Sequence, residues 1–195
     1  MSKGYPLNEK EYRKFLVSLE SLKEICSDIL VGSKELKERL ITDLKESLKK
    51  LFFFIRLMVT KDFESSTGMS FDKWIEFAEK LSKQFGEISN AVQKIHDCYL
   101  KSQLERISES IDELEHTASP FLENYDYTLQ SIGKLQKWLA ETPNKVKSAP
   151  PGFIRDEEKR EMIEGSSKAV ADLQKFTEAL VEAKIKILTI KDFIK

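Results

Sequence analysis

The residues best suited to acid–base or metal chemistry are the two histidines of the chain, His96 and His116. Glu113 and His116 have the E-x-x-H spacing that supplies one side of a carboxylate-bridged di-metal site. Such a site needs a second E-x-x-H on a facing helix, and the sequence contains none. On one straight helix the two histidines would also lie roughly 200° apart around the axis. The spacing therefore predicts no metal site, and no other motif indicates a cofactor.

The thiol of Cys98 is the best candidate nucleophile, because His96 and Asp97 are its near neighbours in the sequence. Residues one or two positions apart on a helix do not face each other, so these three side chains cannot act together within one helix. The chain also has no glycine-rich phosphate loop, no metal-binding cysteine pair and no serine in a strand-to-helix elbow. We therefore expect a non-enzymatic protein.

A run of acidic residues is the clearest candidate for a binding surface. Within residues 105–115, Arg106 is the only basic residue. A charge run of this kind is usually a solvated helix face, but it can also dock a basic partner. The possible partner-binding residues are Glu105, Glu109, Asp112, Glu113 and Glu115.

Length and composition indicate the fold class. The chain has 195 residues, which is enough for a substantial core and predicts one domain over residues 1–195. Only seven glycines and five prolines accompany 33% charged and 41% hydrophobic residues. This composition is typical of a helical protein and not of a turn-rich β protein or a disordered chain. We expect an all-α fold.

The sequence also argues against several locations and partners. Two cysteines are too few for a disulfide framework, so we expect a reduced, cytoplasmic protein. The N-terminal residues contain no apolar core of signal-peptide length, and no apolar run is long enough to cross a bilayer, so neither a targeting signal nor a transmembrane helix is expected. The basic residues form no stripe with interleaved aromatic residues, which argues against nucleic-acid binding.

The helices that carry these residues are predicted from apolar side chains that recur every three or four positions. This spacing indicates helices at residues 8–31, 33–61, 71–118, 120–141 and 156–194, with the main loop at 142–155. Gly32 is expected to end the first helix, although the spacing also allows one continuous helix through Gly32. Pro120 is expected to begin the fourth helix, although a kinked continuous helix keeps the same apolar phase.

Two stretches set the expected shape of the central part of the chain. Residues 62–70, DFESSTGMS, have the composition of a loop, and Ser70 is the predicted N-cap of the next helix. Residues 71–118 then keep a near-continuous heptad repeat with a one-residue slip near Leu100. This repeat predicts a single rod of about 70 Å.

Residues 51–59, LFFFIRLMV, are apolar on every side of a helix except around Arg56. A helix that is hydrophobic all round belongs inside a bundle or a membrane, and nine residues are too few to span a bilayer. We therefore expect this run to be the innermost segment of the fold. Arg56 is expected either to extend its guanidinium outward along an apolar stem or to meet a carboxylate.

The resulting prediction is an all-α, elongated, antiparallel bundle of about five helices with coiled-coil-like heptad packing. The rod at 71–118 is longer than the first two helices, so we expect a homodimer to cover it, unless the final helix folds back along it. The expected function is a protein–protein interaction or scaffold module built from long helices. The alternative is a helical bundle that binds lipid or a membrane surface.

Overall fold

The structure of the protein is a computed structural model that describes residues 9–101 and 103–193. Within these residues the chain is almost entirely helical and has no β-strand, which confirms the expected all-α bundle. The elements are α1 (Glu9–Arg39), a π-helical turn η1 (Leu40–Lys45), α2 (Glu46–Lys49), α3 (Phe53–Thr67), α4 (Phe71–Leu100), α5 (Leu104–Glu123), α6 (Tyr125–Lys147) and α7 (Asp156–Asp192).

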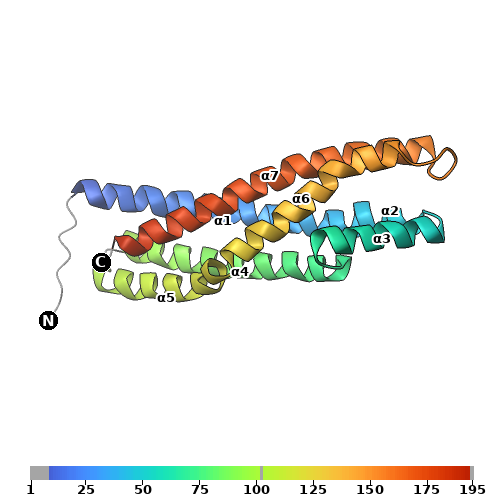
Figure 1. Cartoon of the computed structure of the whole chain (residues 1–195). Coiled ribbons are helices and arrows are strands. Elements are labelled where there is room, and N and C mark those ends of the chain that lie inside the picture. The colour runs from blue at the N-terminus through green and yellow to red at the C-terminus, as the bar shows by residue number, and fades with distance from the viewer. Residues whose placement is uncertain (1–8, 102, 194–195) are drawn as a thin grey trace.

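The bundle is elongated, and its long helices run along its length (Figure 1). Helix α1 packs against α4 and α7, α4 packs against α5, and α6 packs against α7. Helix α6 continues from α5 toward the opposite end of the bundle, so α5 and α6 together act as one interrupted long helix (Figure 1). The core lies between these helices and includes the fully buried Leu22, Ile29, Phe85, Ile88, Ile132, Leu180 and Ala183.

The predicted break at Gly32 is wrong, because α1 continues through this residue to Arg39. Gly32 is instead a close-contact position: a Cβ atom there would lie 2.5 Å from Cδ2 of Phe176 on α7. The first helical segment therefore continues through η1 and α2 and ends at Lys49, where the sequence spacing shows no break. The absence of a side chain at Gly32 serves the approach of α7 and does not end α1.

The predicted rod at residues 71–118 is also wrong. Helix α4 ends at Leu100, and α5, which begins at Leu104, returns along α4 in the opposite direction (Figure 1). The reversal falls at the slip in the heptad repeat, where Leu100 is 66% exposed. The apolar stripes of the two halves face each other, so Leu81, Phe85 and Ile88 are covered within the chain. The uncovered rod that was the reason for expecting a homodimer does not exist.

The remaining boundaries differ in smaller ways. The expected loop at 62–70 is helical as far as Thr67, and the chain turns at Gly68, whose φ is +80°. The predicted N-cap at Ser70 is confirmed, because its hydroxyl accepts a hydrogen bond from the Lys73 N–H at 3.3 Å. Pro120 lies inside α5, and the helix break falls at Asn124. Helix α6 runs on to Lys147, so the main loop spans 148–155. The predicted helix ends at residues 8 and 194 lie outside the described residues.

The Gly32 contact predicts opposite effects for two glycine substitutions. Gly32→Ala should lower the free energy of unfolding by about 1 to 3 kcal/mol, since the methyl group collides with the buried ring of Phe176. Gly86→Ala, at a helical position with open space around it, should raise this free energy by about 0.5 to 1 kcal/mol. Chemical denaturation of both variants and the wild type measures the difference, and equal effects would rule out the tight contact.

Candidate functional site

The apolar run that was expected at the centre of the fold lies largely on its surface, so that prediction is wrong. Phe52, Phe53, Phe54, Leu57 and Met58 are 70%, 62%, 76%, 41% and 71% exposed. We call these five residues the apolar α3 surface. Large contiguous apolar surfaces are unusual on a monomer and mark interaction sites. This surface is therefore the leading candidate for the functional site of the protein.

Helix α3 exposes these residues because it lies on the outside of the bundle and can bury only one side. Phe52 is extended, with φ −54° and ψ +146°, so the chain turns away from α2 before α3 begins. The buried side of α3 carries Phe63, whose ring stacks on Phe71 at 3.9 Å between centroids and meets Trp138 of α6 edge-on. Leu51 is also buried, Ile55 and Val59 are partly buried against the core, and the other apolar residues of the run face solvent.

A polar contact holds α3 against α6. The carboxylate of Asp62 accepts hydrogen bonds from Nε1 of Trp138 at 2.8 Å and from Nζ of Lys145 at 2.7 Å. The bond from Lys145 is the largest of several effects that together lower the pKa of Asp62 below its ordinary value. The apolar α3 surface is thus carried by a helix whose inner side is fixed by both aromatic and charged contacts.

Basic side chains accompany the apolar α3 surface. Residues 49–61 contain Lys49, Lys50, Arg56 and Lys61 and no acidic residue. The half-buried Arg56 places its guanidinium carbon 5.7 Å from the ring centroid of Phe53, within the range of a cation–π contact. This position agrees with the expectation that Arg56 extends along an apolar stem. The surface is therefore apolar with a basic margin.

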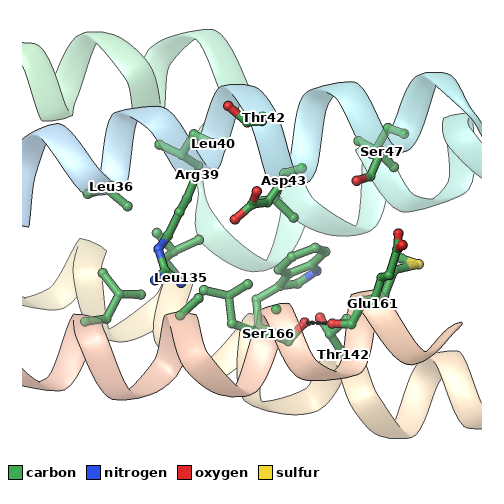
Figure 2. A pocket seen from close by; sticks show the side chains of 18 of the residues that line it. Leu36, Arg39, Leu40, Thr42, Asp43, Ser47, Leu135, Thr142, Glu161 and Ser166 are labelled. Atoms are coloured by element: carbon green, nitrogen blue, oxygen red, sulfur yellow. Dashed lines mark hydrogen bonds between the residues drawn. The ribbon is translucent and has the colours of Figure 1, made fainter. Parts of the chain in front are cut away.

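A groove adjoins the apolar α3 surface and has a volume of about 390 Å³. It opens where η1 and α2 on one side diverge from α7 on the other, with α6 behind (Figure 2). We call it the η1–α7 groove. Its floor is apolar and includes Leu36, Leu40, Leu48, Leu135, Trp138 and Leu173. Its width comes in part from small residues of α7, namely Gly165, Ser166 and Ala169.

Charged residues form the margin of the η1–α7 groove. The Arg39–Asp172 ion pair links α1 to α7 beside it. Acidic side chains at Glu35, Asp43 and Glu161 also line it, and Asp43 is directed between the helices in Figure 2. Lys50, Leu51 and Val59 belong to its lining as well, so the groove and the apolar α3 surface are continuous. No pattern in the sequence indicates this groove, because it arises from the divergence of helices that are distant in the chain.

The acidic residues predicted to bind a partner lie on α5, at the opposite end of the bundle from the start of α3 (Figure 1). Glu109, Asp112, Glu113 and Glu115 are exposed. Glu113 pairs with Lys94 of α4, and Glu115 pairs with Lys191 of α7. The side chain of Glu105 lies outside what the structure describes. At least two of the five residues therefore bind within the chain, and their role toward a partner stays a prediction.

The histidines and cysteines, whose side chains could take part in catalysis or metal binding, are spread over several helices. His96 is on α4 with Nδ1 4.0 Å from a carboxylate oxygen of Asp97, whereas His116 is exposed on α5. Cys98 lies 3.7 Å from the hydroxyl of Ser110, and burial raises the pKa of Cys26 to about 12. Among residues 9–101 and 103–193, no group of three or more His, Cys, Asp or Glu side chains is placed to hold a metal ion, and no helix is long and apolar enough to cross a membrane.

Comparison with known proteins finds no family model, no curated protein and no solved structure that matches this chain. The arrangement of its own residues is therefore the basis for a functional proposal.

The exposure of the apolar α3 surface predicts a sharp contrast between two phenylalanines of one helix. Phe54→Ala should change the free energy of unfolding by no more than about 0.5 kcal/mol, because Phe54 is mostly exposed. Phe63→Ala should lower it by about 3 to 5 kcal/mol, because Phe63 is fully buried. Urea denaturation of both variants tests this, and a large loss in Phe54→Ala would place that residue in the core.

The lowered pKa of Asp62 predicts a pH-dependent contribution to stability. Its charged form is favoured in the folded state, so the contribution is present at neutral pH and is lost as the pH falls through the folded pKa. Asp62→Asn should reduce the free energy of unfolding by less than about 1 kcal/mol at neutral pH, since the pair is partly exposed. The difference from the wild type should shrink toward zero in acid, and a constant difference would contradict this origin.

Proposed function

We propose that the protein is a non-enzymatic protein–protein interaction module that contacts its partner through the apolar α3 surface. The observation that carries this proposal is the exposure of Phe52, Phe53, Phe54, Leu57 and Met58 side by side at one end of the bundle. Hiding such side chains from water is the main source of association free energy. A protein partner with an apolar recess would cover them.

The composition of the surface supports a protein partner. Aromatic residues, methionine and arginine are enriched at the centres of protein interfaces, and Phe54, Met58 and Arg56 supply all three kinds. The anchoring of α3 through Phe63 and Asp62 supports a surface that is formed before binding. A preformed surface binds with a smaller loss of conformational entropy.

The second candidate is a membrane surface, and the basic margin of the α3 surface favours it. The start of α7, at the same end of the bundle, argues against it because residues 155–164 carry five acidic side chains against three basic ones (Figure 1). Anionic lipid headgroups would repel these carboxylates. We therefore favour the protein partner.

The non-enzymatic part of the proposal is supported by the state of the thiols and histidines. The Cys26 thiol, with a pKa of about 12, is protonated at neutral pH and is a poor nucleophile. Cys98 lies on α4, where its sulfur contacts the hydroxyl of Ser110, whereas His116 lies on α5. Both cysteines are free thiols, which suits a reducing compartment such as the cytoplasm.

The test is site-specific photo-crosslinking in the cells that produce the protein. A benzoylphenylalanine at position 54 should cross-link to protein, because this position is exposed at the centre of the apolar α3 surface. The matched control is the same residue at position 17, where Val17 is 62% exposed on α1, and it should give no such product. Mass spectrometry identifies what is attached. Lipid adducts alone at position 54 would replace the protein partner by a membrane, and equal products at both positions would overturn the proposal.

A further inference from the structure

We propose that the partner is a second copy of this chain, and that the apolar α3 surface of each copy packs into the η1–α7 groove of the other. This proposal rests on the proposed function and names its partner. It joins two features that are both unoccupied within the described chain: exposed phenylalanines with a basic margin, and an apolar groove with acidic residues along its edge.

The charges of the two surfaces are complementary. The α3 surface has the basic residues of 49–61 and no acidic ones. The groove lining is acidic overall, with five acidic residues against the two basic residues Arg39 and Lys50; the acidic ones are Glu35, Asp43, Glu158, Glu161 and Asp172. Opposite charges across an interface fix its register and speed association. Neither an anionic membrane nor a uniformly basic partner would match both surfaces at once.

The groove also fits the side chains that would enter it. A cavity of about 150 Å³ is enough to bind one benzene molecule, so the 390 Å³ of the groove can hold about two phenyl rings. Its floor of leucines and Trp138 is apolar, and the added Cβ of a larger residue at Gly165 would meet open space. Two of the three exposed phenylalanines can therefore be buried without moving a helix.

The position of the two surfaces gives a closed dimer. Lys50, Leu51 and Val59 line the groove and also flank the exposed residues of α3, so the two surfaces are neighbours on one molecule. A two-fold axis between them lets one pair of molecules make both contacts at once.

The buried area is sufficient for a stable dimer. Aromatic side chains bury about 150 to 250 Å² each, so the exposed parts of the two phenylalanines that enter the groove amount to roughly 280 Å² per copy. Each copy also covers a similar area of its partner's groove, which gives roughly 1,100 Å² in total, above the roughly 1,000 Å² expected of a specific interface.

Charge reversal tests the pairing directly. In one variant Arg56→Glu is combined with Lys61→Glu, and in the other Asp43→Lys is combined with Glu161→Lys, because the first two residues lie outside the groove lining and the last two belong to it. Each variant alone has two surfaces of like charge, so its dissociation constant should rise by at least about tenfold relative to the wild type. An equimolar mixture of the two should form a heterodimer, because both contacts are then between opposite charges. Lys80→Glu with Lys83→Glu, on the exposed side of α4, is the matched control and should dimerise like the wild type.

Sedimentation equilibrium at tens of micromolar measures the association, and circular dichroism checks that each variant is folded. A wild-type monomer would overturn the second copy as partner, as would a dimer whose strength neither variant changes. Binding of the wild-type monomer to vesicles of phosphatidylcholine and phosphatidylserine in equal parts would also overturn it. Cross-links from position 54 to a different protein would then preserve the proposed function, so the two proposals fail separately.

Discussion

The contact between Gly32 and Phe176 determines how the two ends of the bundle differ. Because Gly32 has no side chain, α7 can lie directly on α1 at this point, and the ring of Phe176 fills the space. On one side of the contact the helices stay together as far as the edge-on pair of Phe15 and Phe193. On the other side they separate beyond the Arg39–Asp172 ion pair, and the η1–α7 groove opens (Figure 2). In one half of the molecule α1 and α7 thus cover each other, and in the other half the η1–α7 groove stays open to solvent.

The π-helical turn η1 lies at this separation. Residues 40–45 hydrogen-bond five positions apart, which widens the helix by one residue and changes the direction of the side chains that follow. Leu40 faces the core at the start of the turn, and Leu48 and Leu51 return to the buried side after it. Such turns occur often at functional sites, and here the turn forms one wall of the groove.

The sequence predicted the class and the helical content well, because they depend on local spacing. Apolar residues at intervals of three and four define α1, α4 and α7 over most of their lengths. Ser70 caps α4 because its hydroxyl accepts a hydrogen bond from a backbone N–H of the first turn. The chain reversals could not be predicted from this spacing, since a heptad repeat has the same spacing in one long helix and in two antiparallel helices. The slip near Leu100 was the one local sign of the turn.

The candidate site was missed for a related reason: apolar residues all round α3 indicate burial only if neighbours exist on every side, and the number of neighbours is a property of the whole fold. The basic residues beside the run, with no acidic residue between Lys49 and Lys61, were the signal that solvent lies nearby.

The same basic residues have a consequence for how the chain reaches its folded state. Residues 51–59 leave the ribosome before α6, which supplies Trp138 and Lys145 to hold α3 in place. Until then this run is an aromatic and β-branched segment of the kind that aggregates through backbone pairing. Lys49, Lys50 and Lys61 flank the segment and Arg56 interrupts it, and charges in these positions oppose stacking of identical segments. The residues that accompany the exposed surface in the folded protein thus also act as gatekeepers during synthesis, when no partner can yet cover it.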